Sequence, residues 1–287
     1  MIDYSPEGPN GLARRRRRLS DQETEHRMLQ AAAALVSHSG LTVSLDHISL
    51  EDVIRDADVS RSAVYRRWPY KDLFFSDLVR ELARDATPTI VEDETQLMRR
   101  VVADHLDWFE TPERRHCLVV ELCRQLALLD FEIIYGSAKW RTYIALHATF
   151  MSLAAGELRD QVQQALAESE QARTVRVAGA WEKLAGLFGY RLRPELGATF
   201  ETLATLLSGT MRGLVIMALS MPEIAVHRAE ASPFGAQDTE QWSLAAIGMA
   251  SLAAAFLEPD PAVVWDAERR ASVGQTLSRW APPDPSS

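Results

Sequence analysis

Residues 49–69 carry the pattern that most constrains how this chain can fold. Apolar side chains recur at helical spacing over Leu50–Ala57, and a second short helix is predicted over Arg61–Trp68. A serine that can act as an N-cap precedes each helix, and a proline ends the second. Asp58 lies in the turn, where a short polar side chain tolerates the left-handed backbone conformation. Two short helices joined by a three-residue turn predict a helix-turn-helix unit, whose second helix enters the major groove of DNA.

The predicted second helix is basic. From Arg61 to Lys71 there are four cations and no acidic residue. Helical spacing turns Ala63, Val64 and Trp68 inward. Arginine can donate two hydrogen bonds to guanine, and serine and tyrosine hydroxyls can reach bases or phosphates. The alternative is a solvated basic face on an ordinary helical hairpin. Four side chains that can contact DNA point outward: Arg61, Ser62, Tyr65 and Arg66.

Flanking helices extend this unit to a domain at residues 20–86. Ser20 and Glu23 form a capping box that opens a helix, and Gly40 ends it. Downstream, Lys71–Ala86 is amphipathic, with Leu73, Phe74, Leu78 and Leu82 as its apolar face.

The order of these elements resembles the TetR family of bacterial transcription regulators. The resemblance covers residues 20–86, and its most specific part is VSRSAVYRRWPYKDLF at residues 59–74. It implies an all-α homodimer with an N-terminal helix-turn-helix domain and a larger helical domain that binds a small molecule and dimerises. It also implies roles for matching residues: base or adjacent phosphate contacts for Arg61, Ser62, Tyr65 and Arg66, and phosphate contacts for Arg67 and Lys71.

The sequence departs from the family pattern at three positions. Asp58 replaces the glycine usual in the turn, and Tyr70 replaces the frequent serine cap of the next helix. Glu51 lies near the start of the first motif helix, where an acidic side chain should repel DNA, so no phosphate contact is carried over to it.

The first 19 residues are predicted to form a flexible basic arm. A secretory signal is excluded because a polar, acidic stretch follows the cations instead of an apolar run. The arm is either a solvated tail or a segment that follows phosphates or enters the minor groove. Its cations are Arg14, Arg15, Arg16, Arg17 and Arg18.

Charge and cysteine content restrict the class of protein. The formal net charge is −9, and most of the excess acid lies beyond residue 88, which suits DNA contact through one cationic face of an acidic body. Cys117 and Cys123 are six residues apart on one predicted helix and point to different faces, so they are not expected to form a disulfide with each other. A chain without disulfides is expected in a reducing, cytoplasmic compartment. No spacing indicates a metal site, and no cofactor is expected. The apolar stretch Ser243–Leu257 is too short to span a membrane.

A larger helical domain is predicted at residues 87–280, with a flexible tail at 281–287. Almost no strand signal is present in it. After a linker at Thr87–Glu94, helices are predicted over Thr95–Glu110, Pro112–Leu129, Ser137–Glu168, Thr174–Phe188, Pro194–Met221, Glu240–Leu257 and Ala262–Trp280.

Two of these helices are predicted to form the dimer interface. Pro194–Met221 has a broad apolar face, and Gly209 and Gly213 within it allow close helix approach. Trp242–Leu257 is apolar almost all round, as expected for a helix buried on most sides. A four-helix bundle across a two-fold axis explains both, and a buried pair within one chain is the alternative. The polar connection Val226–Gln241 is predicted to be a mobile loop.

The effector site is the least constrained feature. The aromatic abundance favours an apolar or aromatic small molecule over a sugar or phosphate, although plain core packing is the alternative role for any one of these side chains. The candidate lining residues are Trp108, Trp140, Tyr143, His147, Phe150, Met151, Trp181 and Met211.

These features predict a ligand-responsive regulator, a repressor of the kind common in such families, that binds a palindromic DNA operator as a homodimer. The first alternative is a regulator of the same fold controlled by a protein partner or by no ligand. The second is a helical enzyme acting on an apolar substrate, which no Ser/His/Asp, Cys/His or paired-carboxylate pattern supports.

Deleting Met1–Leu19 should weaken DNA binding at all sequences alike and flatten its salt dependence, because arginines displace condensed counterions. The preferred half-site should not change. Fluorescence-anisotropy titrations of the full-length and truncated proteins at several salt concentrations measure both effects. An unaltered slope of log affinity against log salt would show that the arginines do not touch DNA.

Overall fold

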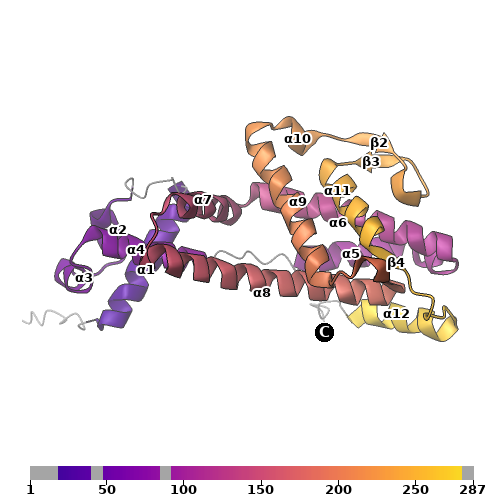
Figure 1. Ribbon diagram of the computed structural model, residues 1–287, viewed down its shortest axis with the longest axis horizontal. Coiled ribbons are helices and arrows are strands. Elements are labelled where there is room, and N and C mark those ends of the chain that lie inside the picture. Colours follow the sequence, from indigo (N-terminus) through magenta and orange to yellow (C-terminus); the bar gives the residue numbers. More distant parts are fainter. Residues whose placement is uncertain (1–18, 40–47, 85–91, 280–287) are drawn as a thin grey trace, which may run out of the picture.

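The computed structural model describes residues 19–39, 48–84 and 92–279, and these are predominantly helical (Figure 1). The first four helices are α1 (Asp21–Ser39), α2 (Leu50–Asp56), α3 (Arg61–Arg67) and α4 (Lys71–Arg84). The middle of the chain forms α5 (Glu92–Asp104), the 3₁₀ turn η2 (Leu106–Phe109), α6 (Pro112–Gly136), α7 (Ala138–Ser152) and α8 (Glu157–Phe188). The predicted all-α fold class is confirmed.

The last third of the chain adds short strands to its helices. Its elements are β1 (Tyr190–Leu192), η3 (Pro194–Leu196), α9 (Phe200–Ser220), α10 (Glu223–Val226), β2 (Ala229–Ala231), η4 (Pro233–Gly235), β3 (Glu240–Trp242), α11 (Leu244–Phe256), β4 (Leu257–Pro259) and α12 (Ala267–Arg279). The strands pair antiparallel as β1–β4 and β2–β3, so the prediction of almost no strand was wrong for these short ribbons.

The predicted N-caps of α1, α2 and α3 are confirmed, whereas Gly40, predicted to end the first helix, lies outside the described residues. The Ser20 N–H donates to Glu23 Oε2 at 2.8 Å, and the Glu23 N–H donates to Ser20 Oγ at 3.1 Å, which is a capping box. Ser49 accepts from the Asp52 N–H, and Ser60 accepts from the Ala63 N–H, both at 3.3 Å. These bonds fix where α1, α2 and α3 begin.

The turn between α2 and α3 adopts the left-handed conformation predicted for Asp58, whose φ is 50°. The Asp58 N–H donates to the Arg55 carbonyl at 3.2 Å, and the Val59 N–H donates to the Ile54 carbonyl at 3.4 Å. This pair of bonds is a Schellman motif, the usual way of ending a helix with a left-handed residue. Asp58 therefore serves where glycine is usual, and it sets the angle at which α3 leaves α2.

The N-terminal core extends beyond residues 20–86. Val64, Trp68, Phe74 and Leu78 are fully buried in it, and the rings of Trp68 and Phe74 meet edge to face at 5.1 Å. Leu73, predicted to lie on the apolar face of α4, is exposed. The same core includes side chains of α7 and of the first half of α8: Leu146, Val162, Ala165 and Leu166.

One long helix connects the two ends of the molecule. In Figure 1, α1–α4 lie at one end, α9, α11 and α12 lie at the other, and α8 runs between them. The prediction of two helices over Ser137–Glu168 and Thr174–Phe188 was right at its outer ends, Ser137 and Phe188, but wrong about the break between them. The chain breaks earlier, at Leu153–Gly156, where Leu153 is extended, and α8 then continues through residues 169–173, all of which tolerate a helix.

The end of α8 requires a glycine. Gly189 has a φ of 71°, and a Cβ there would lie 2.8 Å from Trp265 Nε1. The helix can therefore turn directly into β1, which pairs with β4 after α11. This pairing holds the C-terminal residues against the end of α8.

The segment predicted to be a mobile loop, Val226–Gln241, is largely structured. It forms the β2–β3 ribbon, in which Ala229 faces the buried Trp242. His116 of α6 holds it in place: Nε2 is 2.7 Å from the Phe234 carbonyl, and Nδ1 is 3.0 Å from Tyr190 Oη. The predicted helix start at residue 240 was also wrong, because Ser243 caps α11 at Leu244.

Within the described part of the chain, α9 is the one helix long and apolar enough by composition to cross a membrane. Its buried residues instead pack in the core that it shares with α6 and α11. The opposite side of α9 leaves apolar side chains exposed: Leu206, Ile216, Met217 and Leu219. Among the described residues, none covers this outer face of α9.

Replacing Asp77 with Asn should destabilise the N-terminal core by about 1–3 kcal/mol, because its carboxylate joins α3 to α4. Asp77 Oδ2 accepts from Trp68 Nε1 at 2.7 Å and from Arg67 at 3.2 Å. Urea denaturation followed by tryptophan fluorescence measures the loss. Asp56→Asn, at an exposed Arg55 pair, is the control and should change stability by about 0.5 kcal/mol or less. Equal effects of both variants would contradict a special role for Asp77.

Candidate DNA-binding and effector sites

Helix α3 presents the face that its sequence predicts. Val64 and Trp68 are fully buried, which fixes the rotation of the helix about its axis. With these two side chains inward, the four candidate base-contacting residues are all exposed: Arg61, Ser62, Tyr65 and Arg66. Ser62 Oγ lies 3.4 Å from the Ser60 hydroxyl at the start of the helix.

Glu51, predicted only to repel DNA, binds two of these side chains. Arg61 Nη2 lies 2.6 Å from its Oε2, and Tyr65 Oη donates to its Oε1 at 3.2 Å. The Arg61 and Glu51 side chains are 74% and 47% exposed. An ion pair this exposed contributes about 1 kcal/mol at most, whereas a bidentate contact to guanine contributes about 1–3 kcal/mol. Arg61 can therefore leave Glu51 when a base edge is offered.

Arg66 and Arg67 also have acidic partners. Arg66 pairs with Asp21 at the start of α1, and Arg67 donates from Nε to Glu25 at 3.0 Å and from Nη2 to Asp77 at 3.2 Å. The hydrogen bond to Glu25 raises the pKa of Arg67. Arg67 thus links α1, α3 and α4, which gives this predicted phosphate contact a structural role as well.

Lys71 is exposed at the first position of α4. Its Nζ lies 4.8 Å from the centre of the Phe75 ring, a cation–π contact that still leaves the ammonium hydrogens accessible. The remaining predicted DNA contacts, Arg14–Arg18, lie outside the described residues.

The candidate effector residues fall into separate parts of the molecule. Trp108 packs against the core formed by α5, α6 and α12, and Phe150 against the N-terminal core. Met151 is 75% exposed. Only four of them belong to or pack against the core of α6, α9 and α11: Trp140, Tyr143, Trp181 and Met211.

Trp140, Tyr143 and His147 share one face of α7, as predicted. The rings of Trp140 and Tyr143 meet edge to face at 5.2 Å, and the His147 ring lies 4.4 Å from that of Tyr143. Burial, and then the positive charge of Arg212, lower the pKa of His147. The His147 imidazole therefore stays neutral to a lower pH than the imidazole of a free histidine does.

Charged residues beside these aromatic rings were missed from the sequence. Arg212 of α9 donates to Tyr143 Oη at 2.9 Å and to Glu170 of α8 at 2.6 Å. Arg173 lies 3.6 Å from the same carboxylate. One signal could have identified the site: Arg212 is the only charged residue of α9 after its first turn.

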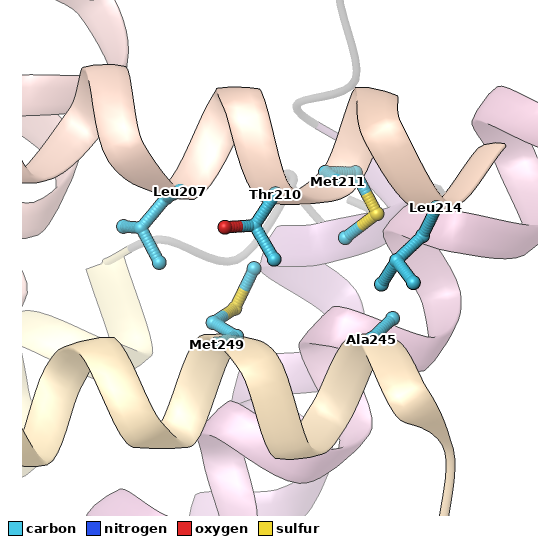
Figure 2. A pocket seen from close by; sticks show the side chains of 6 residues that line it. All are labelled: Leu207, Thr210, Met211, Leu214, Ala245 and Met249. Carbon is cyan, nitrogen blue, oxygen red and sulfur yellow. The ribbon is translucent and has the colours of Figure 1, made fainter. Parts of the chain in front are cut away.

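A small apolar pocket lies between α9 and α11. Figure 2 shows Leu207, Met211 and Leu214 of α9 facing Ala245 and Met249 of α11. The empty space is about 170 Å³, and it has no room for a water-sized molecule. Ligand sites for drug-sized molecules usually measure about 300–1,000 Å³, so this pocket is packing space between two helices.

A more open groove lies between α4 and α8. It has an empty volume of about 520 Å³ that includes open solvent. Its lining is mostly polar, which does not fit the apolar effector predicted from the sequence: Arg80, Gln161, Gln164, Ala165 and Glu168.

Metal and thiol chemistry have little support in the described residues. No group of three or more His, Cys, Asp or Glu side chains gathers there as a metal site would require. Cys117 and Cys123 are both free thiols. Burial raises the pKa of Cys123 to about 12, so this thiol is un-ionised at neutral pH and a weak nucleophile.

Neither a family model nor a curated protein matches the chain. Among solved structures, it aligns with TylP, a TetR regulator from Streptomyces fradiae, at 15% identity and a TM-score of 0.41, covering 91% of this chain and 93% of that one. A putative TetR-family regulator from Mesorhizobium loti aligns at 15% identity and a TM-score of 0.45, covering 83% and 98%.

A third similar structure is SmeT, the repressor of the Stenotrophomonas maltophilia multidrug efflux pump SmeDEF. It aligns at 19% identity and a TM-score of 0.39, covering 84% of this chain and 95% of that one. A complex of SmeT with triclosan aligns at 20% identity and a TM-score of 0.41, covering 84% and 94%. These structures belong to the family whose motif is resembled by residues 59–74 of this chain. At 15–20% identity, a functional assignment depends on the geometry of the chain itself.

Replacing Arg61 with Ala should weaken operator binding by about 1–3 kcal/mol and relax the preference at one base pair in each half-site. The reason is its position in the first turn of α3, exposed and held only by Glu51. Binding-site selection on both proteins, followed by titration of the selected DNA, measures the two effects.

Glu51→Gln is the matched variant, because it removes the charge that holds Arg61 while keeping the side-chain shape. It should raise affinity at low salt and leave the selected sequence unchanged. An Arg61→Ala protein with unchanged motif and affinity would show that Arg61 does not read bases.

Proposed function

We propose that this chain is a transcription regulator of the TetR type that binds a palindromic DNA operator as a homodimer. The observation that carries the proposal is the geometry of α2 and α3. A Schellman turn joins two capped short helices, and burial of Val64 and Trp68 turns the basic face of α3 to solvent. Within this proposal Arg61, Ser62, Tyr65 and Arg66 read bases, and Arg67 and Lys71 hold phosphates.

Selection of duplex DNA from a random pool tests the DNA-binding role directly. The expected result is a palindromic motif whose half-sites lie about 34 Å apart, one helical turn of DNA, or a multiple of this. Failure to enrich any motif, with a protein shown to be folded by circular dichroism, would overturn the proposal.

The outer face of α9 supports the dimer. It exposes Leu206, Ile216 and Met217, while a Cβ on Gly209 or Gly213 would meet no neighbouring atom within 4 Å. The neighbouring helix α11 has no charged residue and exposes the small side chains of its outer side. An apolar, uncharged surface of two adjacent helices fits a second copy of itself, because a two-fold axis brings the same surface from each chain together.

Gly209 and Gly213 of α9 make no close helix approach within the described part of the chain. Close approach of α9 to α11 instead occurs at Gly248, where an added Cβ would lie 2.9 Å from Thr210 Cγ2. Gly209 and Gly213 are thus available for the close helix approach that the sequence predicts, between two copies of α9.

Replacing Gly213 with Glu should dissociate the dimer and abolish operator binding while helical content is kept. A carboxylate at a self-complementary interface is buried twice per dimer, and a monomer loses the linkage between two recognition helices. Sedimentation velocity and an operator titration measure these effects.

Gly179→Glu is the control, since Gly179 is also a helical glycine with open space around its Cβ but lies on α8. It should leave both properties unchanged. A Gly213→Glu protein that remains dimeric and binds DNA normally would place the interface elsewhere.

We further propose that a small molecule controls DNA binding, with repression as the default effect. The mechanism uses α8, which contacts α4 near its start and α9 further along. A ligand that moves α8 would tilt α4 and change the separation of the two recognition helices. Because the half-sites are fixed by the DNA helical repeat, a change of a few ångströms lowers affinity.

A second candidate, a regulator of the same fold that needs no ligand or answers to a protein partner, is favoured by one observation. The apolar pocket between α9 and α11 is too small for a ligand, and the groove between α4 and α8 is polar. Operator binding that no small molecule alters would support this candidate.

A further inference from the structure

Two arginines share one carboxylate where α7, α8 and α9 meet. Arg212 and Arg173 share a single carboxylate, that of Glu170, at 2.6 and 3.6 Å. His147, on the other side of Tyr143, is kept neutral by burial and by Arg212. The cluster of Arg212, Arg173 and Glu170 therefore contains two cations and one anion.

Three hydrogen-bond donors at this junction are buried without a partner among the described residues: Trp140 Nε1, Arg173 Nε and Arg212 Nε. Trp140 is buried, at 3% exposure. Most buried donors in folded proteins are paired, and each unpaired one costs free energy. Three in one place indicate that an acceptor from outside the chain belongs there.

These donors lie around one aromatic group. The guanidinium carbons of Arg173 and Arg212 are each 5.7 Å from the centre of the Trp140 ring, and that of Arg212 is 5.1 Å from Tyr143. A planar aromatic molecule could pack against such rings while its acidic group meets the guanidiniums.

We infer that this junction binds the carboxylate of an aromatic organic acid, through Arg212, Arg173 and the Trp140 indole. The inference rests on the proposed function, since it names the chemical class of the effector. Arginine presents parallel N–H groups that match the two oxygens of a carboxylate. A single excess positive charge suits a monoanion better than a phosphate dianion. The bound acid would compete with Glu170 for Arg212 and so act on both α8 and α9.

Isothermal titration calorimetry of the full-length protein tests the inference with benzoate, 2-naphthoate and indole-3-acetate, each compared with its neutral amide. At least one acid should bind about tenfold more tightly than its amide, as expected for charge-assisted hydrogen bonds. R212Q should lose this preference. W140F, which keeps an aromatic ring but lacks the indole N–H, should weaken binding of the acid several-fold more than binding of the amide.

E170Q gives the opposite expectation, because it removes the competing carboxylate, and should tighten binding of the acid. R124Q is the matched control, since Arg124 also pairs with a carboxylate, that of Glu121, and is 14% exposed against 21% for Arg212, but lies on α6. It should bind the acids as the unaltered protein does.

Two results would overturn the inference: no acid preferred over its amide at millimolar concentration, or a preference that survives R212Q and is unaffected by E170Q. An operator titration on the same samples separates this failure from that of the proposed function. A protein that binds operator but no aromatic acid refutes the carboxylate site alone, whereas a folded protein that binds no DNA refutes the regulator.

Discussion

The packing of α8 against α4 is the contact on which the rest of the structure depends. With 32 residues, α8 is about 48 Å long, at 1.5 Å per residue. Its first half buries Val162, Ala165 and Leu166 in the core that holds the helix-turn-helix, and its second half contributes Ala185 to the core of α6, α9 and α11. Because α8 belongs to both cores, a displacement of α8 in one core would be transmitted to the other. The position of the helix-turn-helix would therefore depend on the packing around the far end of α8.

The electrostatics of α3 follow from a similar sharing of groups. Every arginine of α3 is paired with an acid on another helix: Arg61 with Glu51, Arg66 with Asp21, and Arg67 with Glu25 and Asp77. The exposed pairs of Arg61 and Arg66 are weak in water and can be exchanged for bases and phosphates. The Arg67 pairs are less exposed and join helices. Under the proposed function, Arg61 and Arg66 would therefore serve recognition, while Arg67 joins α1, α3 and α4.

The sequence predicted the N-terminal domain well because local rules determine it. Serine caps, the left-handed Asp58 and the inward Val64 and Trp68 each depend on neighbours a few residues away. The C-terminal elements depend on distant contacts. The β2–β3 ribbon is held by His116, more than a hundred residues earlier in the chain, and no local pattern signals this. The Arg212 cluster was missed for the same reason, because Glu170, Tyr143 and Arg212 come from three helices.

Helix α9 carries both the proposed effector site and the proposed dimer face. On α9, Arg212 points to Tyr143 and Glu170, while the adjacent Gly213 leaves open space on the outer face. Neighbouring residues on a helix are separated by about 100° around its axis, so the two surfaces adjoin without overlapping. A ligand that drew Arg212 away from Glu170 would release a bond between α8 and α9 and alter the position of the face on which a second copy packs. Since α8 is fixed to α4, the spacing of two recognition helices would respond to one exchanged carboxylate.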